Sequence, residues 1–294
     1  MRTAQDKWVV GIGEILWDIL PDGKQLGGAP ANFAYHARSL GARAGLVSGI
    51  GDDNQGAEIL QRLDSWGVDR RHVSVRPEYP TGTVSVTLDE RGVPHYTIQE
   101  NVAWDHIPWS PALEELAARA DAVCFGSLCQ RSLESRETIR RFLAATPVGC
   151  LRVCDINLRQ SYYDAHVIAG LLERASVLKL NDEELPVLSS MFGLSGPTES
   201  VMRGLADRFG LDLVALTRGG RGSLLVTAQA SSNHPGFPVE VVDTVGAGDA
   251  FTAALVVGLL RGDDLDTVNE SASRLAADVC SQAGGTPDVH AMAA

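Results

Sequence analysis

The stretch Asp-Thr-Val-Gly-Ala-Gly-Asp-Ala-Phe at residues 243–251 has the clearest chemical potential in the sequence. The tripeptide Gly246-Ala247-Gly248 directly precedes Asp249, and an apolar helical run follows. Backbone N–H groups that converge at a helix N-terminus bind an anion and stabilise negative charge on a phosphoryl group. A carboxylate beside that anion can accept the proton of an attacking hydroxyl. We therefore expect an anion hole with an adjacent base, although an acidic residue in a first turn also complements the helix dipole.

The strength of this base is a separate expectation. A carboxylate at a helix N-terminus is expected to have a lowered pKa, which would make Asp249 a weak base. Phosphoryl transfer tolerates a weak base, because its loose transition state depends on positioning and electrostatics more than on prior deprotonation. A lowered pKa is therefore compatible with the proposed role.

A second group of residues is suited to a polyhydroxylated ligand. Gly27 and Gly28 precede a helix that carries Asn32 in its first turn, so the backbone can approach a ligand closely while the amide both donates and accepts hydrogen bonds. Asp18 follows the first strand and can accept from neighbouring sugar hydroxyls, although a turn residue is the simpler interpretation. Pro30 is favourable at a helix start for structural reasons alone.

Two common nucleotide-binding fingerprints are absent from the sequence. The only Gly-Lys pair, Gly23-Lys24, is followed by Gln25, so there is no P-loop. Gly11-Ile12-Gly13 follows a strand but lacks the third small residue of a dinucleotide fingerprint. A P-loop or Rossmann enzyme is therefore disfavoured.

Composition excludes several classes of partner. The net charge of −12 and the pI near 5.0 argue against nucleic acid as the main ligand. The N-terminus lacks the apolar segment of a signal peptide, and the apolar run at 251–260 is too short to span a bilayer, so we expect a cytoplasmic protein without a membrane partner. The five cysteines show neither a CxxC pair nor zinc-ligand spacing, and we expect them to be structural.

Short apolar runs alternate with helical patterns along the chain. Strands are expected at 8–13, 44–48, 122–125, 151–156, 177–180 and 213–217. Helices are expected at 30–40, 55–66, 132–144, 163–175, 183–192 and 198–209. This alternation predicts an α/β fold with a mainly parallel, doubly wound sheet covered on both faces, in three layers and one domain spanning 1–294.

One region departs from this alternation and predicts a lid. Residues 83–98 alternate apolar and polar side chains around a turn at Glu90-Arg91-Gly92, which indicates a β-hairpin with one buried face. The segment at about 15–26 can add strands to the same small sheet. We expect these segments, together about 15–26 and 81–107, to form an inserted β-lid over the active site.

The motifs together resemble the ribokinase-like (PfkB) family of carbohydrate kinases. GGAPANFAYHARSLG at 27–41 and DTVGAGDAF at 243–251 are similar to the two signature regions of that family. Asn181-Asp182-Glu183-Glu184 resembles its NxxE motif, and Thr217-Arg218-Gly219-Gly220-Arg221-Gly222 resembles its TxGxxG nucleotide loop. The four motifs occur in the family's order across essentially the whole chain.

The resemblance implies the following roles. ATP would bind along one edge of the sheet, with Mg²⁺ bridging its phosphates; the residues concerned are Asn181, Glu184 (to Mg²⁺ through water), Thr217, Gly219 and Gly222. The sugar would lie under the lid and contact Asp18, Gly27, Gly28 and Asn32. A monovalent cation such as K⁺ would bind near the anion hole at Asp243 and the carbonyl of Val245. Lids of some family members pair, which suggests a homodimer.

Further stretches resemble the fructokinase-like branch, among them FGSLCQRS at 125–132 and DINLR at 155–159. The latter places Asn157 and Arg159 at the end of a parallel strand, where ligands bind in such folds, although Arg159 can equally be a surface residue. The expected activity is ATP-dependent phosphorylation of a primary hydroxyl of fructose. Ribose, 2-keto-3-deoxygluconate or a nucleoside remain alternative acceptors, and a non-catalytic sugar or nucleotide sensor remains an alternative function.

Overall fold

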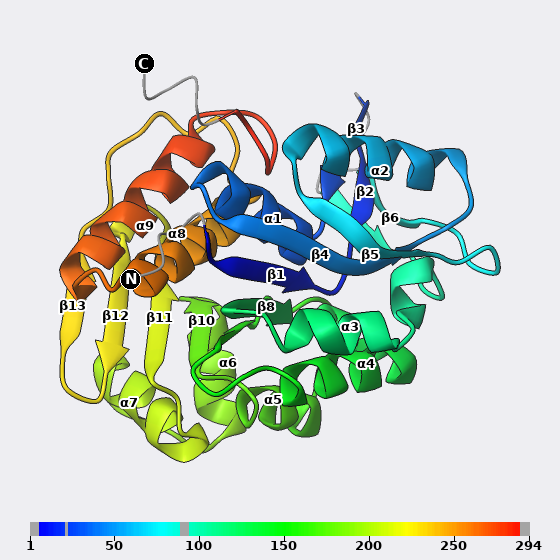
Figure 1. Cartoon of the computed structure of the whole chain (residues 1–294). Helices are drawn as coiled ribbons and strands as arrows, with labels where there is room; N and C mark the ends of the chain where they lie inside the picture. Colours follow the sequence, from blue (N-terminus) through cyan, green and yellow to red (C-terminus); the bar gives the residue numbers. More distant parts are fainter. Residues whose placement is uncertain (1–5, 21–22, 89–93, 289–294) are drawn as a thin grey trace.

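The computed structural model shows a three-layer α/β architecture with a small second sheet attached to one end (Figure 1). It describes residues 6–20, 23–88 and 94–288, and for residues 86–88 and 94–96 it describes the backbone alone. The predicted fold class is confirmed. In the described part of the chain we find no helix with the length and apolar character needed to cross a membrane.

The large sheet has nine strands in the order β13-β12-β11-β10-β9-β8-β1-β4-β5. All neighbours from β11 to β5 are parallel, while β12 and β13 are antiparallel additions at one edge. The strands are β1 (Trp8–Ile12), β4 (Arg43–Ile50), β5 (Asp69–Val75), β8 (Ala122–Gly126), β9 (Leu151–Asp155), β10 (Val177–Asn181), β11 (Leu213–Thr217), β12 (Ser223–Thr227) and β13 (Ser231–His234).

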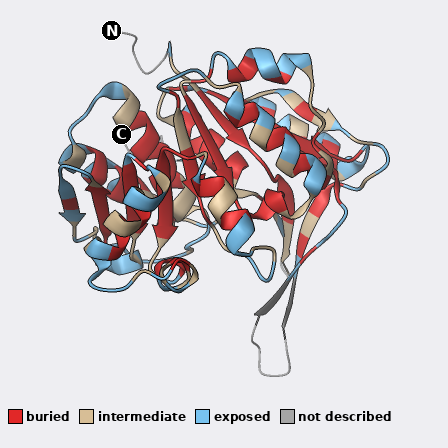
Figure 2. Cartoon of the chain, turned by 90° about the horizontal axis from the view of Figure 1, so that it is seen from below, coloured by how far each residue is buried: buried red, intermediate tan, exposed pale blue. Residues whose placement is uncertain are grey.

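Helices cover both faces of this sheet, and each face has its own apolar core. The first group is α1 (Ala29–Ser39), α2 (Asn54–Trp66), α8 (Ala247–Arg261) and α9 (Leu265–Cys280). The opposite group is α3 (Pro111–Ala117), α4 (Leu133–Ala144), α5 (Ala165–Leu172), α6 (Glu184–Met191) and α7 (Thr198–Phe209). Figure 2 shows the strands between the two layers buried along most of their length, as parallel strands covered on both faces must be.

The elements that sequence patterns missed lie mainly at the edges of the molecule. The sequence patterns did not predict strands β5, β12 and β13 or helices α3 and α9. Strand β5 is half-exposed and carries Arg70 and Arg71, and β13 reads Ser-Ser-Asn-His, so neither has the apolar run of a central strand. Edge strands are bounded by solvent on one side, which removes the signal that identified the central ones.

A four-stranded sheet forms the lid, in the order β3-β2-β6-β7. Its strands are β2 (Leu16–Leu20), β3 (Gly23–Gly27), β6 (Gly82–Leu88) and β7 (Pro94–Ile98). The predicted turn at residues 90–92 lies outside the described residues, as do the side chains of Val86, Leu88 and Tyr96. Val84 and Ile98, which pair across β6 and β7, are buried against this chain's own core.

Strand order determines where a ligand can bind. The chain passes from β1 to β4 and β5 on one side, and later returns to β8, β9 and β10 on the other. In open α/β sheets the crevice beyond the carboxyl ends of the strands at such a switch point accommodates ligands. The residues after β1 and β9, the lid strands and the start of α8 all contribute to this end of the sheet.

Candidate active site

The N-terminus of α8 has the geometry that the glycine-rich stretch predicts. Helix α8 begins at Ala247, and its N-cap residue, Gly246, has the left-handed φ of 75°. A Cβ atom on Gly246 would lie 2.4 Å from the Gly285 carbonyl oxygen, so both the backbone conformation and the close approach of the C-terminal segment require glycine. The first N–H groups of a helix have no intrahelical partner and are free to bind an anion.

Asp249 lies in the first turn of α8 and is held by a residue from α1. The Asn32 side-chain amide donates a 2.8 Å hydrogen bond to Asp249 Oδ2. Asn32 is only 3% exposed, and its Oδ1 atom has no hydrogen-bond partner. A buried acceptor without a partner is costly, and a hydroxyl of a bound ligand would satisfy it. The structure therefore brings together two of the residues expected to bind and activate a hydroxyl.

The expectation of a lowered pKa for Asp249 is wrong. Burial, and to a smaller extent the negative charge of Asp155, raise the pKa of Asp249 from its usual 3.8 to about 7. The hydrogen bond from Asn32 and the positive charges of Lys179 and Arg159 oppose this shift but are outweighed. Desolvation of the carboxylate is the largest cause of this shift, and a base with a pKa near neutrality is better matched to proton transfer at physiological pH.

A buried ion pair behind the start of α8 was missed by the sequence analysis. Lys179 Nζ donates to Asp155 Oδ1 at 3.1 Å, and the two residues face each other on the neighbouring strands β10 and β9. A Cβ atom on Gly248 would lie 2.8 Å from Lys179 Nζ, which places the ammonium group against the start of α8. The available signal was a lysine within the apolar strand sequence Val-Leu-Lys-Leu-Asn, since a buried charge is rarely found without a partner.

The lid contributes Asp18 to the same end of the sheet. Asp18 lies on β2 and Gly27 pairs with the adjacent part of that strand from β3. A Cβ atom on Gly27 would lie 2.4 Å from Asp18 Oδ2, so glycine leaves room for this carboxylate. Gly28 has a φ of 108° and a Cβ there would lie 2.5 Å from the Glu14 carbonyl oxygen. Burial raises the pKa of Asp18 to about 6, against the opposing charge of Arg159.

Arg159 is electrostatically central although its side chain is exposed. Its charge lowers the pKa of each of three carboxyl groups, those of Glu14, Asp18 and Asp249, below what burial alone would give. Arg159 therefore lies within electrostatic reach of all three, as a sugar- or phosphate-binding residue would. Asn157 has a left-handed φ of 41°, and its carbonyl oxygen accepts a 3.3 Å hydrogen bond from Ser127 Oγ. This geometry gives Asn157 a role in shaping the loop that carries Arg159.

Asn181 and Glu184 hold each other at the start of α6. Asn181 Oδ1 accepts from the backbone N–H of Glu184 at 2.9 Å, while Glu184 Oε2 accepts from the N–H of Asn181 at 2.8 Å. The second carboxylate oxygen of Glu184 accepts from the N–H of Leu158 at 2.9 Å. Both oxygens of Glu184 are therefore engaged in a buried clamp between the loops after β9 and β10. Glu184 is not placed as a direct metal ligand.

The residues expected to bind the nucleotide lie at the carboxyl end of β11 and in the turn that follows it. Thr217 ends β11, and the 3₁₀ turn Gly219–Arg221 leads to Gly222 and β12. Gly219 has a φ of 55° and no atom within 4 Å of its Cβ position, so this turn is open to a ligand. Gly222 has a φ of 80° and approaches the backbone of His234 so closely that a Cβ would lie 2.0 Å from its carbonyl oxygen. Gly222 is therefore required by the conformation of the turn and by its close contact with the His234 backbone.

Asp243 organises the loop before α8. Its carboxylate accepts from the backbone N–H groups of Val245 and Gly284, both at 3.0 Å. These bonds join the loop before α8, in which the monovalent cation site is expected, to the loop after α9. Over residues 6–20, 23–88 and 94–288 there is no group of three or more His, Cys, Asp or Glu residues that could hold a metal ion.

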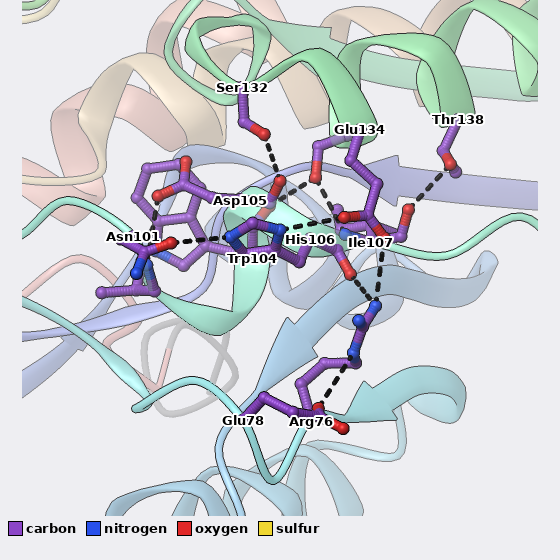
Figure 3. A network of polar contacts seen from close by, with 12 residues as sticks. Arg76, Glu78, Asn101, Trp104, Asp105, His106, Ile107, Ser132, Glu134 and Thr138 are labelled. Atoms are coloured by element: carbon purple, nitrogen blue, oxygen red, sulfur yellow. Dashed lines mark hydrogen bonds and ion pairs between the residues drawn. The ribbon is translucent and has the colours of Figure 1, made fainter.

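The segment that returns from the lid is fastened to α4 (Figure 3). His106 contacts Glu134 Oε2 through Nδ1 at 2.9 Å and Asn101 Oδ1 through Nε2 at 3.0 Å. Arg76 donates to the His106 carbonyl oxygen and to Glu134 Oε1. This network fixes the 3₁₀ turn Ala103–His106, whose Asp105 forms a buried ion pair with Arg131 at 2.8 Å. One end of the lid therefore has a rigid attachment.

Comparison with known proteins agrees with this geometry. The chain is 32% identical over 264 residues to a fructokinase of Salmonella typhimurium, covering 86% of this chain and 83% of the relative. The crystal structure of an uncharacterized sugar kinase of Pyrococcus horikoshii in complex with ATP matches with a TM-score of 0.80 at 28% identity, covering 95% and 94% of the two chains. A fructokinase of Vibrio cholerae O395 with bound fructose, ADP and calcium ion matches with a TM-score of 0.83 at 25% identity, covering 98% of each chain.

The profile of pfkB family carbohydrate kinases matches residues 22–292. This match includes the glycine-rich start of α1, the buried clamp before α6 and the glycine-rich start of α8. The family expected from the motifs is thereby confirmed, and the chain belongs to the pfkB family of carbohydrate kinases.

Proposed function

We propose that this carbohydrate kinase transfers the γ-phosphoryl group of ATP to a primary hydroxyl of a neutral monosaccharide, with fructose as the first candidate. The observation that carries this proposal is the placement of Asp249. It lies at the head of α8, hydrogen-bonded to Asn32, with a pKa of about 7. A carboxylate near neutrality beside an anion-binding helix N-terminus is suited to phosphorylating a hydroxyl.

The residues act in two groups. Asp18, Gly27, Gly28 and Asn32 grip the acceptor, and the free Oδ1 of Asn32 accepts a hydrogen bond from one of its hydroxyls. Asp249 takes the proton of the attacking hydroxyl as the new P–O bond forms and the bond from the γ-phosphorus to the leaving ADP breaks. The N–H groups of Gly246-Ala247-Gly248 stabilise the charge on the transferred phosphoryl group, and Mg²⁺ neutralises charge on the phosphates when bound.

The nucleotide is assigned to the edge formed by Thr217 and Gly219, with Asn181 nearby. Glu184 orders the loops on which phosphate and Mg²⁺ depend, and it would reach the metal only through water. Asp243 and the carbonyl of Val245 are proposed to bind a monovalent cation, which would act by setting the loop that precedes α8. A K⁺ titration of the activity tests that assignment.

A neutral acceptor is favoured by the charges at the sugar end of the site. Three carboxyl groups, those of Glu14, Asp18 and Asp249, lie at this end of the site, and among the described residues Arg159 is the one positive charge that acts on all three. Like charges in a buried site repel strongly, so an acidic acceptor such as 2-keto-3-deoxygluconate is disfavoured. Neutral hydroxyls can donate to these carboxylates without that penalty.

A coupled assay of ADP release tests the proposal. The acceptors are fructose, ribose, mannose, 2-keto-3-deoxygluconate and adenosine, each with and without Mg²⁺ and K⁺. We expect the highest kcat/KM with fructose. A preference for the acid or the nucleoside would overturn the neutral-sugar assignment, and binding without turnover for every acceptor would support a sensor.

We also propose a cytoplasmic homodimer that associates through its lids. The proposal rests on the exposed position of the small sheet, while Val84 and Ile98 are already covered within the chain. Light scattering at micromolar concentration measures the mass directly, and a monomer would remove the dimer from the proposal.

A further inference from the structure

The Lys179–Asp155 pair lies where neither a substrate contact nor ordinary core packing accounts for it. The side chains of Lys179 and Asp155 are 8% and 4% exposed. Replacing a buried ion pair by apolar residues is often neutral or stabilising, so stability alone does not explain two charges at this point of an apolar sheet. Their distinguishing feature is their contact with the start of α8.

Both members of the pair are joined to α8. Thr252 Oγ1 lies 2.9 Å from Asp155 Oδ2 and 2.9 Å from the carbonyl oxygen of Gly248, so its hydroxyl links the pair to the first turn of the helix. Lys179 Nζ is so close to Gly248 that a methyl group there would displace it. The pair therefore packs against the first turn of α8, where the proposed anion hole forms.

We infer that Lys179 and Asp155 are positioning residues for phosphoryl transfer, holding the start of α8 in place and setting the charge state of Asp249 from behind. The inference rests on the proposed role of Asp249 as base. Lys179 supplies a permanent positive charge behind the anion hole, where a phosphoryl group gathers negative charge. The negative charge of Asp155 partly offsets that positive charge at Asp249, so that Asp249 remains basic enough to accept a proton.

The two charges act on Asp249 in opposite directions. Asp155 raises the pKa of Asp249, and Lys179 lowers it. The remaining groups that face Asp249 are Arg159 from the loop after β9, Cys124 from β8 and the neutral amide of Asn32 from α1. Glu184 at the start of α6 and Cys124 also feel the charges of Lys179 and Asp155. Because these residues stay in place in every variant, removal of one charge should move the titration of Asp249 in the direction set by the charge that is lost.

The experiment follows the Asp249 carboxyl carbon by NMR in protein labelled with ¹³C at aspartate side chains. The resonance is assigned from its loss in Asp249→Asn, and its titration requires no turnover. We expect Lys179→Met to raise the pKa of Asp249 and Asp155→Asn to lower it. In active variants, the pH at half-maximal kcat/KM should shift in the same directions.

A matched control is provided by the second buried ion pair, Asp105–Arg131, which lies under the lid's return segment. Arg131→Met also leaves a buried carboxylate without its partner, yet it should leave the titration of Asp249 unchanged. The double variant Asp155→Asn/Lys179→Met leaves no unpaired charge, and its Asp249 pKa should lie between those of the single variants.

Each outcome decides the matter. Opposite shifts in folded single variants support the inference, and shifts in one direction, or none, overturn it. If the single variants do not fold, the double variant carries the test, and a natively folded double variant with a reduced kcat supports the inference. If none of the three variants folds, the pair serves the stability of the core and the inference is overturned. Opposite shifts of the Asp249 titration in a protein that phosphorylates none of the tested sugars would support the control of Asp249 by the pair and remove the proposed function.

Discussion

The Asn32 side-chain amide donates a 2.8 Å hydrogen bond to the Asp249 carboxylate across 217 positions of sequence. This bond joins the first turn of α1 to the first turn of α8, so the two glycine-rich helix starts form one site. Because the amide also has a free buried Oδ1, Asn32 can orient a ligand hydroxyl and the base that deprotonates it. The packing of α1 against α8 thus has a direct consequence for chemistry.

Asp249→Asn should abolish most phosphoryl transfer while leaving nucleotide and sugar binding nearly intact. The amide keeps the size of the side chain but cannot accept a proton, and loss of a general base costs about 100- to 10,000-fold in kcat. Steady-state kinetics and calorimetric titration measure the two effects separately.

The matched control for this variant is Asp266→Asn. Asp266 is also an acidic residue in the first turn of a helix, α9, but it is exposed and remote from the site. If Asp249 merely complemented its helix dipole, both variants would lose a similar, small amount of stability and retain activity. Near-normal turnover of Asp249→Asn would therefore exclude the role of base.

The pH dependence of kcat/KM should reflect the raised pKa of Asp249. The base must be deprotonated to work, and its pKa is about 7 instead of the usual 3.8. Activity should consequently rise with pH, reach half its plateau near pH 7, and fall about tenfold per pH unit below that point. A profile that is flat between pH 5 and 8 would contradict the raised pKa.

Local sequence patterns predicted the parts of the fold that depend on neighbouring residues. The strand at 213–217 and the helix at 198–209 have the predicted bounds, because apolar periodicity and capping glycines are local signals. The lid strands were also foreseen from alternation around a glycine turn. Edge strand β13, with four mainly polar residues, offered no such signal.

The properties of the base could not be predicted in this way. The pKa of Asp249 depends on Asp155 and Lys179, which reach it from two other strands, and on burial that only the assembled layers create. The position of Asp249 at a helix N-terminus, considered alone, therefore predicted a pKa shift in the wrong direction. The glycines were better indicators, since close backbone approach at Gly246 is a requirement that no other residue can meet.

Asn32→Leu should weaken sugar binding and raise the pKa of Asp249. The leucine removes the hydrogen bond that lowers this pKa and the free acceptor for a sugar hydroxyl. Loss of one neutral hydrogen bond costs about 0.5–1.5 kcal/mol, so KM for the sugar should rise by roughly 2- to 13-fold with little change in KM for ATP. An unchanged sugar KM, measured in the same coupled assay, would place Asn32 outside the sugar site.

Gly248→Val and Gly246→Val should differ in their main effect. The left-handed φ belongs to Gly246, where a Cβ would also collide with the Gly285 backbone, so valine there should destabilise the fold. At Gly248 the first atom met is the movable end of Lys179, so valine should leave a folded protein with little activity. Thermal unfolding and kcat together distinguish the two, and comparable losses of stability would show that both glycines are chiefly structural.

Sugar binding should order the lid but leave its attachment unchanged. Asp18 on β2 is half-buried near Arg159, and a bound sugar would join this strand to the residues at the start of α1 and α8. Amide hydrogen exchange in 16–20, 23–27, 83–88 and 94–98 should therefore slow on adding sugar. The turn at 103–106 is already held by the network around His106 and Glu134, and it serves as the internal control. Equal protection of the turn and the strands would indicate a general stabilisation of the fold, and unchanged exchange in the strands would contradict closure of the lid over the acceptor.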